Sequence, residues 1–321
     1  MASTVQKKAS PLLVIIAFAT VYIVWGSTYF FIRMAEQGGL PPFLLGAVRF
    51  TLAGILLMVW CVIKGEKIFV WQNILHASVS GILLLFVANG IVIWSEQTLP
   101  SAMVAILVSS APIWFVLIDK PHWNTNLGNK STIIGLVIGF LGVILLFSEQ
   151  LGNVFKEGAH SQLPWMFLLL FGTISWSSGS LYSKYNLTSG SAQVNSAWQM
   201  IVAGLVFIPG GMLHHDFSNF RPENVQTQGW LGLWYLILFG SIAAFSAYVW
   251  LLQVRPATQV STYAYVNPVI AVILGILFAH ENISLQQIGG LVIILGSVLL
   301  INLAKYRKEK QTAVASELLN E

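Results

Sequence analysis

The stretch Trp94–Pro112, WSEQTLPSAMVAILVSSAP, has a counterpart at Trp250–Pro268, WLLQVRPATQVSTYAYVNP. The two stretches share a Trp, a Gln and two Pro residues at one offset of 156 residues: Trp94, Gln97, Pro100 and Pro112 match Trp250, Gln253, Pro256 and Pro268. Tryptophan and proline are rare residues, so four matches at one spacing indicate that the chain arose by duplication.

Further paired motifs extend the duplication in both directions. They recur at offsets of 150 to 154 residues: Gly26-Ser27-Thr28-Tyr29 with Gly179-Ser180-Leu181-Tyr182, Ala53-Gly54 with Ala203-Gly204, and Gly135 and Gly142 with Gly289 and Gly296. The drifting offset is expected of short insertions in loops. We predict two repeats, over residues 11–149 and 163–304, and a tail over 305–321 that is polar and disordered beyond Lys310.

The amino-acid composition indicates the environment in which this protein folds. Hydrophobic residues make up 56% of the 321 residues and charged residues only 9%, whereas a soluble domain carries about 25% charged residues. A helix that spans a membrane needs roughly 20 apolar residues. Ten stretches meet this requirement: 12–32, 43–63, 73–95, 101–119, 131–149, 163–183, 194–213, 230–251, 257–279 and 284–304. We therefore predict an all-α polytopic membrane protein with five transmembrane helices in each repeat.

An odd number of helices in each repeat makes the two repeats enter the membrane from opposite sides. Such inverted repeats are typical of transporters, in which a central cavity near the membrane midplane lies between the halves. Basic residues predict the orientation. With both termini in the cytoplasm, twelve Lys and Arg residues fall on the cytoplasmic side and only Arg33, Lys156 and Arg221 fall outside. The formal charge of +4 thus reflects loops that face anionic lipid, and it does not indicate a nucleic-acid partner.

Three stretches of the sequence resemble those of a known family. Trp25–Arg33 (WGSTYFFIR), the pair Arg49-Phe50 and the run Tyr263–Pro268 (YAYVNP) are similar to the EamA family of the drug/metabolite transporter superfamily, and most of all to its bacterial inner-membrane permeases. The resemblance covers almost the whole chain. It implies two inverted five-helix repeats, a multi-pass location in the bacterial inner (plasma) membrane, and metabolite movement, often outward.

The first helix of each repeat offers aromatic candidates for the cavity wall. Trp25 and Tyr29 are four residues apart and share one helix face, and Trp176 and Tyr182 occupy the corresponding region of the second repeat. The alternative interpretation is a packing face with a tryptophan near the membrane interface. Pairing across the repeats favours the cavity for all four.

Arg49 is the most informative single residue. An arginine at the centre of a membrane helix costs roughly 2.5–3.5 kcal/mol on insertion scales, so some interaction must offset this cost. Its counterpart near Gln199 is also polar. One hypothesis is that Arg49 binds a substrate carboxylate with two hydrogen bonds. The alternative is a structural ion pair with Glu96, or an Arg49 side chain that reaches the outer headgroups.

The third helix brings Asn89 and Trp94 toward the outer side, where they are further cavity candidates, together with Glu96. A carboxylate in a partly dehydrated site tends to have a raised pKa, so Glu96 is the candidate for proton coupling. The alternative is that Glu96 is an ordinary solvated residue at a helix end.

The fourth helix of each repeat carries a proline, Pro112 or Pro268, which removes a backbone hydrogen bond and predicts a kink. In a membrane such freed groups are tolerated where other helices, water or a cavity satisfy them. Polar and aromatic residues surround both prolines, and we assign these to the substrate cavity: Ser110, Trp114, Tyr263, Tyr265 and Asn267. The alternative is a pair of kinked helices held by inter-helix hydrogen bonds.

Glycines mark the fifth helix of each repeat. Gly135 and Gly139 form a G-x-x-x-G pattern, which permits close contact between helices. This contact could be internal, between the repeats, or could form a homodimer, so the chain is expected to be a monomer or a homodimer.

Catalytic motifs are absent from the sequence. There is no G-x-x-x-x-G-K-[ST] and no H-E-x-x-H, which are the signatures of P-loop nucleotide hydrolysis and of zinc proteases. The sequence therefore predicts no cofactor, no metal site and no enzymatic activity. It predicts a secondary transporter of amino acids or similar amphiphilic metabolites, working by alternating access and exporting its substrate, with proton coupling left open; its partners are a small-molecule substrate and membrane lipid. A membrane-embedded enzyme or lipid-handling protein with the same cavity is the alternative, and a pore is a weaker one.

Overall fold

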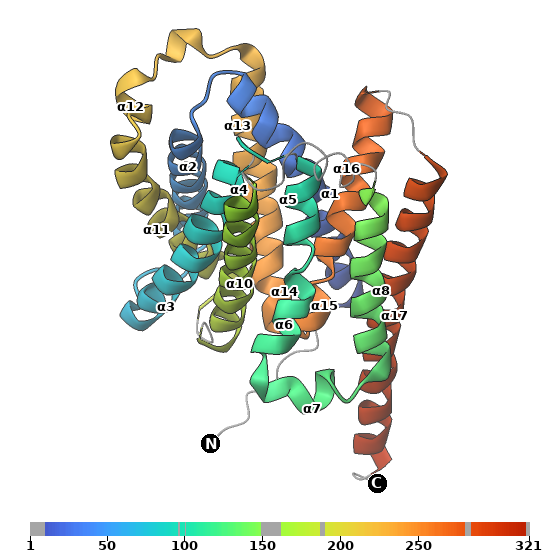
Figure 1. Cartoon of the computed structure of the whole chain (residues 1–321). Coiled ribbons are helices and arrows are strands. Elements are labelled where there is room, and N and C mark those ends of the chain that lie inside the picture. The colour runs from blue at the N-terminus through green and yellow to red at the C-terminus, as the bar shows by residue number, and fades with distance from the viewer. Residues whose placement is uncertain are drawn as a thin grey trace.

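The computed structural model describes residues 10–95, 97–99, 101–148, 162–186, 190–279 and 284–318. Every regular element within these ranges is helical (Figure 1). The first repeat contains α1 (Pro11–Gln37), α2 (Pro42–Ile63), α3 (Trp71–Gly81), η1 (Ile82–Ala88), α4 (Asn89–Ser95), α5 (Ser101–Val108), α6 (Ala111–Ile118), η2 (Lys120–His122), α7 (Trp123–Asn126) and α8 (Lys130–Leu146). The second contains α10 (Leu163–Asn186), α11 (Ala192–Leu213), α12 (Asp216–Asn219), η4 (Pro222–Asn224), α13 (Thr227–Tyr235), η5 (Leu236–Phe245), α14 (Ser246–Val254), α15 (Ala257–Val260), α16 (Tyr263–Ala279) and α17 (Leu285–Leu318).

Several of these helices are suited to a membrane. Within the described ranges, seven are long and apolar enough to cross one, and a pair bent by 73°, Met103–Ile118 with Lys120–Asn126, raises the number to eight at most. The apolar helix α8 has 17 residues and is shorter. The predicted all-helical, multi-span architecture is thus confirmed, whereas the number of ten spans remains a prediction.

The two repeats share irregular features as well as helices. Each has a π-helical segment within its third helix, η1 in the first repeat and η5 in the second. Each also has a broken fourth helix, with the break at Ser109-Ser110 between α5 and α6 and at Ser261-Thr262 between α15 and α16. The sequence duplication is therefore also a duplication of backbone detail.

Corresponding helices of the two repeats pack against each other and run antiparallel. In the pair formed by α2 and α11, Gly46 lies beside Phe207 and Gly210 beside Phe43. The pair formed by α8 and α17 is likewise antiparallel, because Gly135 lies beside Ile301 and Gly290 beside Leu146. Antiparallel contact between equivalent helices is what a pseudo-two-fold axis in the membrane plane requires.

The α2 and α11 crossing is reciprocal. Gly54 of α2 lies against Ile201, and its counterpart Gly204 of α11 lies against Thr51, which is the counterpart of Ile201 at the same offset of 150. Self-complementary contacts of this kind are found across a two-fold axis. Glycine is required here because a Cβ on Gly204 would lie 2.5 Å from the backbone nitrogen of Thr51.

The predicted G-x-x-x-G contact is internal. Gly135 faces Ile301 of α17, and Gly139 faces Ser297 of α17 and the ring of Tyr265. These glycines therefore join the fifth helices of the two repeats within one chain.

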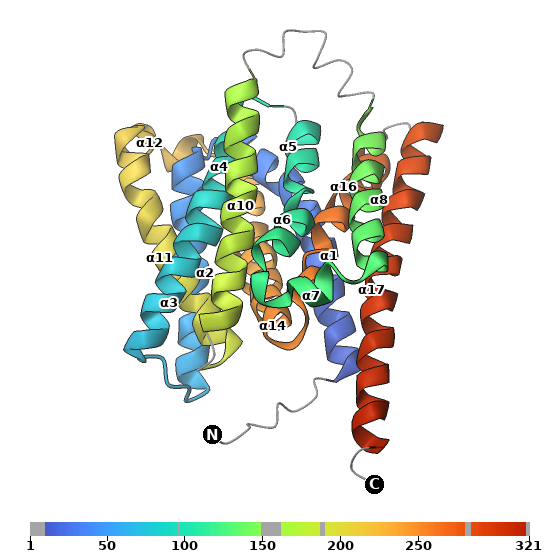
Figure 2. The same cartoon turned by 60° about the horizontal axis from the view of Figure 1, so that its bottom comes forward.

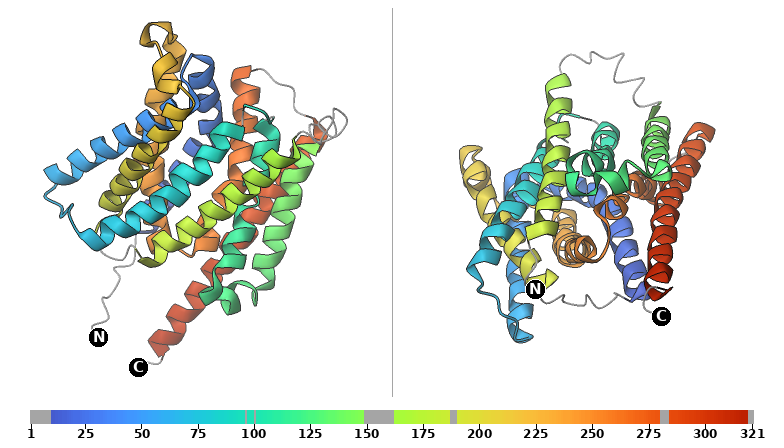
Figure 3. Two further views of the ribbon diagram at one scale, coloured as in Figure 1. Left: turned by 60° about the vertical axis from the view of Figure 1, so that its left-hand side comes forward. Right: turned by 90° about the horizontal axis from the view of Figure 1, so that it is seen from below.

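The helices form two groups with a central region between them. Figures 1 and 2 show α2, α3 and α11 on one side and α8 and α17 on the other, with α1, α14 and α16 between them. Figure 3 shows the same separation from below. Helix α1 begins and helix α17 ends on one face, which we call the termini face; α1 ends and α2 begins on the opposite face, the far face (Figure 1).

The predicted disorder of the tail is wrong for its described part. Helix α17 continues to Leu318, beyond Lys310, where disorder was expected. The segment is polar, but it is rich in Lys, Glu, Gln and Ala, which are good helix formers, and the preceding apolar part of α17 provides the helix nucleus that a short isolated segment would lack.

We predict that Gly204→Ala lowers the free energy of unfolding by about 1–3 kcal/mol, the usual cost of overpacking, because the added methyl group collides with the Thr51 backbone. Thermal unfolding of the purified full-length protein in detergent measures this. Gly296→Ala is the matched control, since nothing lies within 4 Å of a Cβ at this helical glycine. Equal midpoints for the two variants would contradict the proposed role of the crossing.

Candidate functional site

A cavity lies in the central region, between helices of both repeats. Its volume is about 90 Å³, which is enough for several water molecules, because one water needs about 10–15 Å³ on this measure. Both repeats contribute residues to its wall: Trp25, Thr28, Tyr29, Ile32, Arg49, Phe50, Leu85, Ala88, Asn89, Val92, Val108, Ala111, Gly172, Thr173, Trp176, Gly240, Phe245, Tyr263 and Asn267.

The cavity brings together seven of the thirteen residues that the sequence nominated. These are Trp25, Tyr29, Arg49, Asn89, Trp176, Tyr263 and Asn267. They come from α1, α2, α4, α10 and α16, so aromatic rings and polar groups from distant parts of the chain line one space.

Arg49 is buried and has a donor group without a partner. The residue is only 4% exposed. Its Nε donates to Ser241 Oγ at 2.9 Å, and its guanidinium carbon lies 4.8 Å from the centre of the Phe50 ring. Its Nη1 has no hydrogen-bond partner among the described residues. Within the same ranges the structure contains no ion pair to Arg49, so this positive charge lines the cavity with a free donor.

The π-helical segments help to form the site. η1 contributes Leu85 and Ala88 to the cavity wall, and η5 contributes Gly240 and Phe245. Gly240 also accepts a hydrogen bond from Trp25 Nε1 at 3.1 Å. Short π-helical segments within α-helices are frequent at functional sites, and here both members of the pair occur at the cavity.

Asn267 adds a second polar atom without a partner. The residue is 4% exposed, lines the cavity, and its Oδ1 has no hydrogen-bond partner among the described residues. A buried polar group without a partner costs about 1–3 kcal/mol. Arg49 and Asn267 therefore both line the cavity, and each has a buried polar atom, a donor in Arg49 and an acceptor in Asn267, without a partner among the described residues.

A cluster of four aromatic residues, which we call the aromatic floor, closes the cavity toward the termini face. It consists of Trp25, Trp176, Tyr248 and Tyr263, with ring centres 4.8–6.4 Å apart. The hydroxyl of Tyr248 accepts from Trp176 Nε1 at 3.1 Å and lies 2.6 Å from Ser180 Oγ. Because these rings come from α1, α10, α14 and α16, the floor joins the two repeats.

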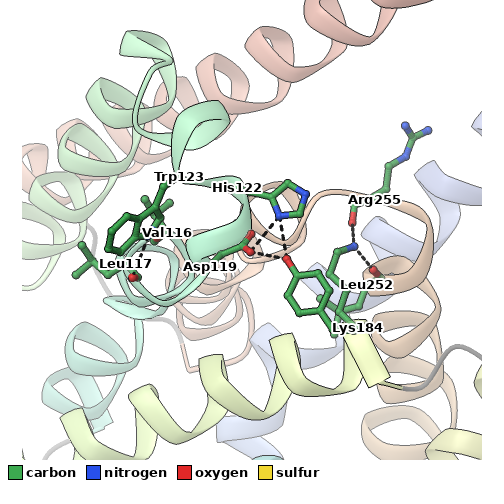
Figure 4. Close-up of polar contacts among 9 residues, drawn as sticks. Val116, Leu117, Asp119, His122, Trp123, Lys184, Leu252 and Arg255 are labelled. Carbon is green, nitrogen blue, oxygen red and sulfur yellow. Dashed lines mark hydrogen bonds and ion pairs between the residues drawn. The ribbon is translucent and has the colours of Figure 1, made fainter.

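Polar links between elements lie below the floor, at the termini face, and Figure 4 shows the contacts of Asp119, His122 and Lys184. Asp119 is 3% exposed; it accepts a hydrogen bond from Tyr185, and its Oδ1 lies 3.1 Å from His122 Nδ1. Lys184 donates to the carbonyl groups of Leu252 and of Arg255. These contacts connect the end of α10 to the first repeat and to the end of α14.

A further link at this face joins α1 to the broken fourth helix of the second repeat. The hydroxyl groups of Tyr22 and Thr262 are 2.6 Å apart. Several specific contacts therefore join elements next to the termini face, on the other side of the aromatic floor from the cavity.

Six of the nominated residues lie outside the cavity. Trp94 contacts Trp165 and His214 at the far face; the Ser110 hydroxyl accepts from Trp114 Nε1; and the Tyr265 hydroxyl donates to the Leu136 carbonyl. Tyr182 pairs with His76, and Gln199 donates to Ser183. The proton-coupling candidate Glu96 lies outside the described residues.

Inversion explains the separation of Tyr29 from Tyr182 and of Arg49 from Gln199. Equivalent residues of inverted repeats that lie away from the membrane midplane are at opposite depths, so Tyr29 and Arg49 can line the cavity without Tyr182 and Gln199. Pairs closer to the midplane can both line it, as Ala111 and Asn267 do. The prediction that both members line one cavity was wrong for this reason.

The helix breaks lie before the prolines. Pro112 occupies the first turn of α6, where its missing N–H needs no partner, and Pro268 lies inside α16, after the break at Ser261-Thr262. Pro268 leaves the carbonyl of Ala264 without its helical donor. Ser109 Oγ lies 2.8 Å from this oxygen and 2.7 Å from the carbonyl of Ala105, so one hydroxyl joins the two broken helices.

Several cavity residues had no distinguishing signal in the sequence. Leu85, Ala88 and Phe245 are ordinary apolar residues, and sequence periodicity does not separate π-helical from α-helical turns. The pair Gly240-Ser241 could have been noticed as small residues within an apolar helix. Among the described residues, no group of three or more His, Cys, Asp or Glu side chains could hold a metal ion.

Comparison with known proteins identifies the architecture. Residues 12–148 and again residues 163–303 match the EamA-like transporter family. The uncharacterized inner membrane transporter YedA of Escherichia coli K12 is 36% identical over 302 residues, covering 93% of this chain and 94% of that protein.

More distant similarity points the same way. The uncharacterized transporter YoaV of Bacillus subtilis is 22% identical, with 88% of this chain and 94% of that protein covered. A crystal structure with 18% identity covers 94% of this chain and 100% of that chain with a TM-score of 0.75; it has the same fold.

We predict that Ser109→Ala lowers the free energy of unfolding by about 1–3 kcal/mol, because the Ala264 carbonyl is then buried without a donor. Thermal unfolding of the full-length protein measures the change. Thr20→Ala is the control, since Thr20 is outside the core and donates only to the Ile16 carbonyl of its own helix. If both variants unfolded like the wild type, the hydrogen bond between the fourth helices would carry no stability.

Proposed function

Because the chain belongs to the EamA-like transporter family, we propose that it is a secondary transporter that exports small carboxylate-bearing metabolites, amino acids foremost, by alternating access. The chain is a multi-pass membrane protein, and its relative YedA is an inner membrane transporter. Ten membrane spans in two inverted repeats and a cytoplasmic location of both termini are part of the proposal.

The unpartnered Nη1 of Arg49 is the observation that carries the substrate class. A buried guanidinium pairs well with a carboxylate because two parallel N–H···O bonds fit between them. With Nε occupied by Ser241, the outer edge of the guanidinium remains available to an anionic ligand. A bound carboxylate would offset the cost of keeping this charge within the membrane.

Asn267 and the aromatic walls support amino acids within this class. An ammonium group can donate to the free Oδ1 of Asn267, which lines the same cavity as Arg49. The rings of Trp25, Tyr29 and Trp176 offer apolar surface to a side chain, as ligand pockets commonly do.

The position of the cavity relative to the contacts at the termini face supports alternating access. The cavity lies on one side of the aromatic floor, and the links of Asp119, Lys184 and Tyr22 lie on the other. In the opposite state, Tyr182 and Gln199 would take the places that Tyr29 and Arg49 occupy here, since they are their counterparts. Proton coupling, with Glu96 as its carrier, remains a separate part of the proposal.

We predict that Arg49→Gln abolishes recognition of carboxylate ligands. Phenylalanine, hydrocinnamate and phenethylamine differ in their carboxylate and ammonium groups, so their effects on the thermal midpoint separate the two contacts. A ligand at 100 times its Kd stabilises the folded state by about 2.7 kcal/mol. We expect wild type to respond to phenylalanine and Arg49→Gln not to respond, with Arg49→Lys retaining part of the response.

Transport and a control complete the test. Arg221→Gln, which changes an exposed arginine, should bind and transport as the wild type does. Phenylalanine carried across proteoliposomes should be recovered unchanged, because an enzyme would alter it. Equal stabilisation by phenylalanine and phenethylamine, retained in Arg49→Gln, would show that Arg49 is structural and would refute the proposed substrate class.

A further inference from the structure

A second pocket opens at the termini face, away from the central cavity. It lies between α1, α15 and α17 and has a volume of about 460 Å³. We call it the lateral groove and define it by Ile15, Ala19, Arg255, Gln259 and Leu299, which are among its lining residues. The proposed function makes no use of it.

The groove faces the surroundings of the protein. Ile15 is 65% exposed and Leu299 is 58% exposed, and these side chains stand on α1 and α17 at the two edges of the groove. Within a membrane-spanning bundle, large exposed apolar residues contact lipid chains. The groove is therefore open to the hydrocarbon layer along its length.

Polar groups line the inner wall. Arg255 and Gln259 lie on either side of the start of α15. Figure 4 shows that the Arg255 guanidinium points away from Lys184, although the Arg255 carbonyl accepts the Lys184 hydrogen bond. The Oε1 of Gln259 is buried and has no hydrogen-bond partner among the described residues.

Together, these features point to an amphiphile with a negative charge and a hydrogen-bond donor in its head. Arginine binds phosphate oxygens well, whereas the amide oxygen of Gln259 can only accept. A phosphodiester alone offers no donor, so the headgroup must supply a hydroxyl or an ammonium group. The apolar edges of the groove suit an acyl chain.

We propose that the lateral groove is a binding site for phosphatidylglycerol from the leaflet at the termini face. Its phosphate binds Arg255, a glycerol hydroxyl donates to Gln259, and an acyl chain lies along Ile15 and Leu299. Charge complementarity supports an anionic lipid here, because the sequence of α17 continues beyond the groove into Lys305, Arg307, Lys308 and Lys310. Basic residues next to a membrane span attract anionic lipid.

The site adjoins contacts that hold the termini face closed. Arg255 binds the lipid with its side chain, and the carbonyl group of the same residue accepts a hydrogen bond from Lys184. Tyr22 lines the groove and makes the hydrogen bond to Thr262. A bound lipid therefore touches both links, and its loss is expected to weaken the closed half of the protein.

The test measures lipid binding to the purified full-length protein by native mass spectrometry and by the thermal midpoint. The added probes are dioleoylphosphatidylglycerol, dioleoylphosphatidylcholine, dioleoylphosphatidic acid and glycerol 1-phosphate. We expect one phosphatidylglycerol to bind more tightly than either other lipid, and glycerol 1-phosphate not to displace it. Displacement by glycerol 1-phosphate at equal concentration would show a site for a free phosphate compound and would overturn the lipid assignment.

Three variants of the protein separate the contributions of the positive charge, of the hydrogen-bond acceptor and of the space in the groove. Arg255→Gln removes the charge and should weaken phosphatidylglycerol binding about tenfold, as loss of a charged hydrogen bond does. Gln259→Leu should narrow the preference for phosphatidylglycerol over phosphatidic acid. Ala19→Trp fills the groove from an exposed position on α1. It should weaken phosphatidylglycerol binding at least as much as Arg255→Gln does.

Ile16→Trp is the matched control for Ala19→Trp. Ile16 is 52% exposed on the same helix and does not line the groove, so binding should be unchanged. If Arg255→Gln proved unstable on gel filtration, Ala19→Trp alone would decide. Wild-type lipid binding in Ala19→Trp, or an equal affinity of the wild type for phosphatidylcholine, would overturn the proposal. Carboxylate recognition through Arg49 is independent of these variants, so the two proposals can fail separately.

Discussion

The reciprocal contact between α2 and α11 holds the two repeats together. Lipid surrounds both helices with an environment as apolar as their side chains, so their association relies on close packing rather than on the hydrophobic effect. Gly54 and Gly204 let each helix approach the other's backbone. The same crossing places Arg49, five residues before Gly54, and Gln199, five residues before Gly204, at opposite depths.

The two broken helices lie at the centre of the protein, where other helices can satisfy their free backbone groups in the absence of water. An unsatisfied backbone carbonyl is costly where water is absent, so breaks in the fourth helices require donors from other elements. Ser109 supplies one to Ala264, across the boundary between the repeats. The break in one fourth helix thus supplies a donor to the other, and both π-helical segments contribute residues to the cavity wall.

The two repeats are similar in sequence, but they contribute different residues to the site, because the cavity lies on one side of the aromatic floor. Tyr29 and Arg49 line it, whereas Tyr182 and Gln199 are engaged with His76 and Ser183. The aromatic floor separates the two environments. Its rings and the links beneath it are the contacts that would have to break in the proposed alternating-access mechanism.

The membrane environment, the helical class and the duplication could be predicted from the amino-acid sequence, because they follow from local composition and from identities at fixed spacing. It also indicated Arg49, since a charge within an apolar span is visible without a structure. Which polar residues line the cavity, and where the fourth helices break, became known from the three-dimensional arrangement of the helices. These depend on contacts between residues such as Ser109 and Ala264, 155 positions apart, and the periodicity of a single helix carries no information about partners so distant in the chain.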